Sequence, residues 1–118
     1  MHIQIKRIYE PTSDGDGQRV LVDRLWPRGI RKSDAGLDFW AREVAPSDQL
    51  RKWFNHDAAR WADFKLRYYE ELDSKPKAVK RLIGQVNQPV VTLLFATREQ
   101  SLNNAAALRD YLIKRFDL

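Results

Sequence analysis

Charged and aromatic side chains are concentrated in the stretch DRLWPRGIRK, which follows a run of apolar residues. Asp23 and Arg24 place a carboxylate that could transfer a proton beside a guanidinium that could hold an anion. The proline after Trp26 restricts that residue to extended backbone, so its indole ring can form a fixed pocket wall. Arg28 supplies a second planar fork that suits a phosphate or carboxylate group. These residue types predict a site for a small anionic ligand, with Asp23 as its acid or base.

A structural interpretation of the same stretch stays open. Asp23 could accept hydrogen bonds from the loop backbone and hold one arginine, with Trp26 packed in the core. Ion-pair networks that only stabilise a fold bring together the same residue types as binding sites do. The two interpretations differ in whether the guanidinium groups are free to meet a ligand.

His56 is a second candidate for catalysis, because imidazole titrates near neutral pH and can act as a general acid or base. It has Asp57 beside it and Arg60 one helical turn further on. A histidine at such a helix junction could equally fill a gap or cap a helix. Arg98 is a further candidate for holding the anion, because it follows the apolar run VTLLFAT. Ligands of open α/β sheets usually bind beyond the carboxyl ends of such strands.

Hydrophobic periodicity predicts the elements that position these residues. The expected strands are residues 3–9, 19–25 and 90–96, and the expected helices are residues 37–45, 48–54, 58–73, 76–86 and 102–116. Ser47, Asp57 and Ser101 are the expected helix caps. The continuous apolar run of the third strand indicates burial on both faces. The sequence therefore predicts a layered α/β fold, a short and mostly parallel sheet flanked by helices, with the direction of the first two strands left open.

The length of the chain, its composition and the motifs it lacks narrow the class of protein. The chain has 118 residues, the size of one domain spanning 1–118, and no apolar run approaches the length of a bilayer crossing. It contains no cysteine and only two isolated histidines, so we expect no disulfide and no metal site. The phosphate-loop and dinucleotide-binding glycine motifs are absent, so we expect no cofactor. A cytoplasmic protein without a signal peptide is the default expectation.

The charge balance favours an anionic partner. Lys and Arg number 21 against 16 Asp and Glu, which gives a net charge of +5. The leading hypothesis is a binding protein or enzyme for a phosphate- or carboxylate-bearing small molecule. The alternative is a nucleic-acid-binding regulatory module that uses the basic loop, and its signature would be an affinity that falls steeply with salt. A third interpretation is an assembly protein without a ligand. The sequence leaves open whether the protein is an enzyme and which oligomeric state it adopts.

The motifs RVLVDRLWPRG, APSDQLRKWFNHD, RWADFKLRYYEEL and VTLLFAT, the last followed by NNA, together resemble the YeaO-like bacterial proteins. These form part of domain-of-unknown-function family 488, and the resemblance spans nearly the whole chain. It implies a compact cytoplasmic bacterial α/β protein and adds Asn103 to the candidate ligand-binding residues. Asn104 departs from the family pattern, in which a histidine is expected after the asparagine, and Phe95 stands where a tyrosine is expected. Both departures weaken a mechanism built on the last strand and helix.

Overall fold

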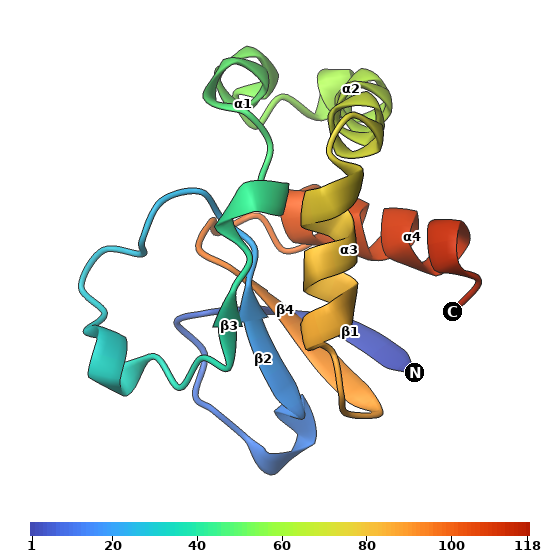
Figure 1. Ribbon diagram of the computed structural model, residues 1–118. Helices are drawn as coiled ribbons and strands as arrows, with labels where there is room; N and C mark the ends of the chain where they lie inside the picture. Colours follow the sequence, from blue (N-terminus) through green and yellow to red (C-terminus); the bar gives the residue numbers. More distant parts are fainter.

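The four strands of the protein form one sheet in which every neighbouring pair runs parallel. The computed structural model describes all residues from Met1 to Leu118. The strands are β1 (His2–Arg7), β2 (Gln18–Leu21), β3 (Phe39–Trp40) and β4 (Val90–Phe95), in the spatial order β1-β4-β2-β3 (Figure 1). Both β1 and β2 pair with β4 in parallel, so the direction that the sequence left open is parallel for both. The α/β class and the parallel sheet are confirmed.

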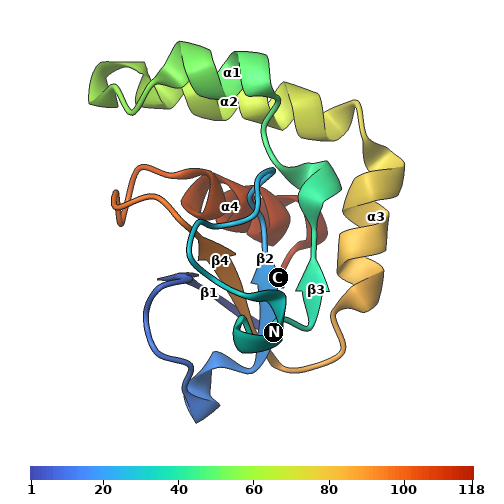
Figure 2. The same cartoon turned by 90° about the vertical axis from the view of Figure 1, so that its left-hand side faces the viewer.

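Four α-helices surround the carboxyl edge and one face of this sheet. They are α1 (Asp48–Phe54), α2 (Trp61–Asp73), α3 (Pro76–Gln85) and α4 (Asn104–Phe116). The strands β2 and β3 point toward α1 and α2, which lie beyond their carboxyl ends (Figure 2). The helix α4 packs against β1 and β4. None of these helices combines the length and apolar character that a membrane crossing requires.

The two faces of the sheet bury different partners because successive side chains of a strand point in opposite directions. On one face Val20, Leu93 and Phe95 join a large core with the helices. The helix side chains in that core include Phe64, Tyr68, Leu72, Val79, Leu82, Leu108 and Leu112. On the other face Leu21 and Leu94 pack against residues of the loop between β2 and β3. The strand β4 is therefore buried on both sides, which explains its continuous apolar sequence.

Polar groups occupy the amino-terminal half of the second face. Asp16 is buried and accepts hydrogen bonds there from Arg19 at 2.6 Å and from Lys6 at 2.9 Å. The hydroxyl of Thr92 donates to the carbonyl oxygen of Asp16 at 2.7 Å. Burial would raise the pKa of Asp16, but the bonds from Lys6, the Ser13 backbone, Arg19 and the Ser13 hydroxyl hold it well below its ordinary value. This network fixes the turn that leads into β2.

The prediction of a helix over residues 37–45 was wrong. Residues Phe39–Trp40 form the edge strand β3, and Arg42–Val44 form one 3-10 turn. The backbone N–H groups of Asp38 and Ala41 donate to carbonyl oxygens of β2, so pairing with the open sheet edge replaces helical bonds. The apolar spacing resembled a helix because Trp40 packs on the loop side of the sheet while Ala41 and Val44 join the helix-side core.

Several boundaries also differ from the predicted ones, and three of these differences involve proposed site residues or helix caps. The strand β2 ends at Leu21, four residues earlier than expected, so Asp23 and Arg24 lie in the following loop. The cap of α4 is Asn103, whose Oδ1 accepts from the backbone N–H of Ala106 at 2.9 Å, and not Ser101. The helix α2 begins at Trp61, after a separate 3-10 turn that Asp57 caps. The Ser47 cap of α1 and the first-turn position of Pro76 in α3 are confirmed.

Candidate functional site

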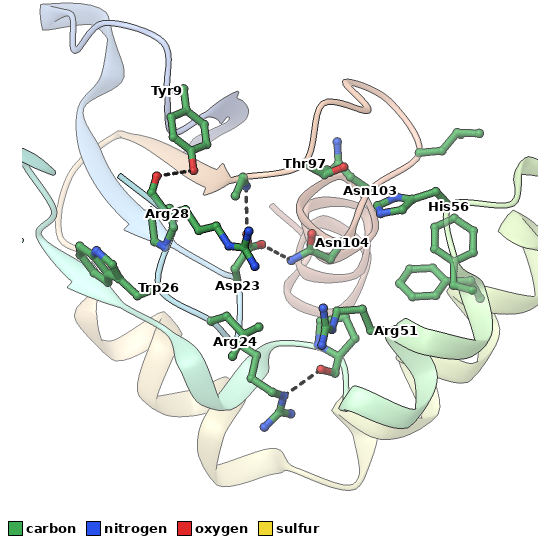
Figure 3. A pocket seen from close by; sticks show the side chains of 17 residues that line it. Tyr9, Asp23, Arg24, Trp26, Arg28, Arg51, His56, Thr97, Asn103 and Asn104 are labelled. Atoms are coloured by element: carbon green, nitrogen blue, oxygen red, sulfur yellow. Dashed lines mark hydrogen bonds between the residues drawn. The ribbon is translucent and has the colours of Figure 1, made fainter. Parts of the chain in front are cut away.

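A pocket with a volume of about 400 Å³ lies beyond the carboxyl ends of β2 and β4 (Figure 3). Its walls come from the loops that follow β1, β2 and β4, from α1 and the residues on either side of it, from Phe64 of α2 and from the first residue of α4. Polar lining residues are Tyr9, Asp23, Arg24, Arg28, Arg51, His56, Thr97, Asn103 and Asn104. Apolar lining residues are Leu25, Trp26, Pro27, Pro46, Phe54, Phe64, Ala96 and Leu102. The pocket thus brings together every residue that the sequence proposed for a site except Arg98, which lies exposed outside the lining.

Asp23 is held on the pocket wall by two neutral donors. Its Oδ2 accepts from the backbone N–H of Ala96 at 2.9 Å, and its Oδ1 accepts from Nδ2 of Asn104 at 2.9 Å. Burial raises the pKa of Asp23, while the bonds from Asn104 and Ala96 and the positive charge of Arg51 oppose that rise. No arginine or lysine forms an ion pair with this carboxyl group. Asp23 therefore occupies none of the guanidinium groups around the pocket through an ion pair.

Asn104 was noted in the sequence only as a departure from the family pattern. It is the first residue of α4, and its side-chain amide donates to the carbonyl oxygen of Val22 at 3.0 Å as well as to Asp23. Both of its N–H groups are therefore engaged. The amide joins the start of α4 to the residues that directly follow β2.

The three arginines of the pocket differ in how tightly they are held. Arg24 donates from Nε to the carbonyl oxygen of Pro46 at 3.1 Å, and its Nε lies 3.9 Å from Oδ1 of Asp48. Arg51 donates to the same Asp48 oxygen at 3.3 Å, although its side chain is half exposed. The guanidinium of Arg28 is exposed and takes part in no hydrogen bond and no ion pair within the protein. Only the carbonyl oxygen of Arg28 is bonded, because it accepts from the hydroxyl of Tyr9 at 2.8 Å.

Sequence reasoning missed Arg51 as a pocket residue. It lies in α1, 27 positions after Arg24, and nothing in its neighbourhood distinguishes it from a solvated helix residue. The fold brings the end of α1 over the carboxyl edge of the sheet, and only that arrangement brings Arg51 into the pocket lining.

Trp26 forms a fixed wall of the pocket. Its indole Nε1 donates to the carbonyl oxygen of Ile30 at 2.7 Å, and its ring meets Trp40 edge-on at a centroid distance of 5.3 Å. The ammonium group of Lys32 lies 5.9 Å from the ring centre. Trp26 is therefore both a pocket residue and part of the smaller core on the loop side of the sheet.

His56 lies at the rim of the pocket with unusual backbone geometry. Asn55 and His56 both have positive φ, at 46° and 54°, as the chain turns away from the end of α1. A left-handed backbone is uncommon for residues other than glycine. The exposed ring of His56 lies 6.4 Å from that of Phe54, and no hydrogen bond joins it to Asp23. Asp23 and His56 share the pocket without forming a bonded acid–base pair.

Asn103 caps α4 and also secures the loop before it. Its Nδ2 donates to the carbonyl oxygen of Glu99 at 2.8 Å, while its Oδ1 accepts from the backbone N–H of Ala106. The backbone N–H groups of Leu102 and Ser101, and then the charge of His56, lower the pKa of Glu99.

No group of three or more His, Asp or Glu side chains is arranged to hold a metal ion.

The fold and the pocket define a parallel α/β protein with a cationic pocket at the carboxyl edge of its sheet. The family model described as the inactive DUF488-N3 subclade matches residues 2–118, and the chain belongs to this family. It is 43% identical over 112 residues to the YeaO protein of Escherichia coli K12, which covers 95% of this chain and 97% of that protein. It is also 43% identical over 110 residues to protein Rv3073c of Mycobacterium tuberculosis H37Rv and to protein Mb3100c of Mycobacterium bovis, over 93% of this chain and 92% of each relative. No solved structure matches the chain significantly.

Proposed function

We propose that this protein binds a small molecule that carries a phosphate or carboxylate group, in the pocket beside Asp23 and Arg28. The observation that carries the proposal is the free guanidinium of Arg28 at the wall of a concave pocket. A guanidinium offers five N–H donors in a planar fork, and the protein itself satisfies none of those of Arg28. A phosphate or carboxylate is the group that matches this fork in shape and charge.

The charge of the pocket supports the same proposal. Arg24, Arg28 and Arg51 contribute three positive charges to the lining, and Asp23 contributes the one carboxyl group. An anion in this pocket would meet an excess of positive charge in a partly desolvated place, where electrostatic attraction is stronger than in water.

The shape of the pocket favours a small molecule over a nucleic acid. Phe54, Phe64 and Leu102 give it apolar walls, and a volume of about 400 Å³ lies in the range of small-molecule sites. A nucleic acid would instead need several cations spread along an exposed surface. Binding of oligonucleotides alone, erased by salt, is the outcome that would favour the nucleic-acid alternative.

Binding without turnover is the form of the proposal that the observations favour. The family is described as inactive. Asp23 accepts hydrogen bonds from Ala96 and Asn104, and His56 forms none with it. The two residues therefore do not form a hydrogen-bonded acid–base pair that would support a catalytic role. Asp23 and His56 enter the proposal as pocket walls.

Thermal unfolding in the presence of small anions tests the proposal. Inorganic phosphate, a nucleoside monophosphate, a sugar phosphate, a dicarboxylate and a short oligonucleotide are each titrated at low and at moderate salt. A ligand that binds the folded state raises the melting temperature in a saturable way. The expected result is such a rise from at least one small anion, lost in Arg28→Ala.

Arg31→Ala is the matched control for this experiment. Arg31 lies in the same loop, is exposed, and neither lines the pocket nor forms a side-chain hydrogen bond or ion pair. The control should keep the saturable rise. Arg98→Ala tests the earlier proposal that Arg98 helps to hold the anion, and we expect it to behave like the control. Equal loss in the Arg28 and Arg31 variants would mean that general surface charge, and not the pocket, attracts the anions.

A further inference from the structure

The pocket carries hydrogen-bond acceptors as well as cations, and they lie on one wall. Asn104 has both amide hydrogens committed, one to Val22 and one to Asp23. These two bonds also fix which way the amide faces, because the opposite orientation would set Oδ1 of Asn104 against two oxygens. Its Oδ1 accepts from no group of the protein.

The free oxygen of Asn104 is not fully buried. No buried side-chain nitrogen or oxygen of the protein lacks a partner, so an atom without one cannot be buried. Asn104 lines the pocket, and Oδ1 is its one unengaged polar atom. Asp23 stands directly beside it in Figure 3. The two carboxyl oxygens of Asp23 have about four acceptor positions, and the bonds from Ala96 and Asn104 fill two of them.

We propose that the anionic ligand also carries an N–H donor group that this wall receives, attached to an apolar or aromatic body. The inference rests on the proposed function and narrows its ligand class. Oδ1 of Asn104 and the unfilled positions of Asp23 would accept the N–H group. Arg28 and Arg51 would hold the anionic group, and the body would lie against Phe54 and Leu102.

Charge complementarity on this wall explains why an N–H group would be accepted in a cationic pocket. The carboxyl of Asp23 forms no ion pair with any cation of the protein, so it remains free to attract a partial or full positive charge. Carboxylates accept from the amino groups of nucleobases, as they do from ammonium groups. Two sources fit this chemistry: a nucleoside monophosphate whose base bears an amino group, and an aromatic α-amino acid.

Two pairs of probes distinguish these sources and test the donor requirement. The first pair is adenosine 5′-monophosphate and purine riboside 5′-monophosphate, which differ by the exocyclic amino group. The second pair is phenylalanine and 3-phenylpropionate, which differ by the ammonium group. Affinities are measured by isothermal titration calorimetry at low salt on the parent chain, Asn104→Leu, Asp23→Asn and Arg28→Ala.

The expected result is that the donor-bearing member of one pair binds the parent about tenfold more tightly, the effect of one well-placed hydrogen bond to a charged acceptor. That preference should fall at least about threefold in Asn104→Leu and in Asp23→Asn. The donor-less member should still bind both variants, and it should bind Asp23→Asn at least as tightly as the parent because that substitution removes a negative charge from the pocket. This retained binding shows that the pocket is still folded. Arg28→Ala should weaken both members of the pair alike.

Three results would overturn the inference, and they have different meanings. If both members of each pair bind the parent equally and Arg28→Ala abolishes binding, the anion site stands and the donor requirement is wrong. If no probe binds the parent chain, the proposed function fails for these anions and the donor requirement fails with it. A preference that survives unchanged in both Asn104→Leu and Asp23→Asn would also contradict the inference, because another group would then be the acceptor.

Discussion

The amide of Asn104 donates to the carboxyl of Asp23 at 2.9 Å and thereby ties the first residue of α4 to the loop after β2. The same amide reaches the carbonyl oxygen of Val22 at 3.0 Å. The bond to Asp23 is one of the interactions that lower its pKa against the effect of burial.

Replacing Asn104 by alanine should raise the pKa of Asp23 further, because a hydrogen bond to the charged form is lost. A carboxyl group whose pKa is raised in the folded state stabilises the fold at low pH and loses that contribution as the pH rises through the folded-state pKa. Asn104→Ala should therefore lose more stability toward neutral pH than the parent does. A titration of the Asp23 side chain by carbon NMR checks the pKa, and urea unfolding at several pH values checks the slope. An unchanged pKa would show that this bond does not stabilise the carboxylate.

Asp16 should give the opposite pH dependence. Its pKa is held below the ordinary value of 3.8, so its contribution to stability is complete above that pH and is lost progressively as the pH falls below it. At pH 7 Asp16→Asn should lower the free energy of unfolding by about 3 kcal/mol, because Arg19 and Lys6 lose their buried partner. The variant should therefore unfold at lower urea concentrations than the parent. The gap between variant and parent should narrow in acid. A gap that stays constant down to pH 2 would assign the loss to packing and not to charge.

The hydroxyl of Tyr68 should contribute measurably to stability. It is fully buried and donates to the carbonyl oxygen of Val44, the last residue of the 3-10 turn that leads from β3 toward α1. Tyr68→Phe keeps the ring in the core and leaves that carbonyl oxygen without this donor, which should cost about 1–3 kcal/mol in chemical unfolding. Tyr69→Phe is the control, because that neighbouring ring is only partly buried. Equal losses in the two variants would argue against the bond to Val44.

Two glycines with positive φ should respond very differently to alanine. At Gly17 an added Cβ would lie 2.2 Å from the carbonyl oxygen of Val90, a backbone atom that cannot move aside cheaply. At Gly29 nothing lies within 4 Å, and only the left-handed backbone opposes the substitution. Gly29→Ala should therefore cost about 1–2 kcal/mol, and Gly17→Ala distinctly more. Urea unfolding of the two variants side by side measures the difference, and similar midpoints would contradict the close approach at Gly17.

His56 should be dispensable for folding and useful for binding. Its backbone lies in the left-handed region, which glycine adopts without the penalty that other residues have, while its ring is exposed at the pocket rim. His56→Gly should leave the melting temperature unchanged or slightly higher and should weaken the anion-induced rise. Glycine at Asn55, the other left-handed residue, serves as the control because Asn55 does not line the pocket. A clear drop in stability for His56→Gly would instead assign the ring a packing role.

Much of this architecture could be predicted from the sequence because the signals are local. The Ser47 cap, the first-turn Pro76 and the doubly buried run of β4 each depend on a few neighbouring residues. The edge strand β3 could not be predicted in this way. Its two residues form a strand because β2 offers free backbone groups for pairing beside them. That pairing depends on the folded sheet and not on the spacing of apolar residues in the sequence.

The residues of the candidate site also divide into those that local sequence signals identify and those that only the folded protein brings together. The stretch from Asp23 to Arg28 was found from its unusual residue types, and the pocket lies there. Arg51 was missed because α1 meets this loop only in the folded protein, and Asn104 was seen as a departure from a pattern before its contact with Asp23 was known. Arg98 satisfied the rule that ligands bind at strand ends, but the loop after β4 leaves it outside the pocket lining.

The loop between β2 and β3 covers one face of the sheet and also walls the pocket, through the same residue, Trp26. A lineage that changed this residue to suit a new ligand would also disturb the packing beneath it. Leu25 and Arg28 also line the pocket, but both are exposed and neither packs in a core cluster of the protein. Divergence in ligand preference among relatives is therefore expected at exposed lining positions such as Leu25, with the tryptophan retained beside it.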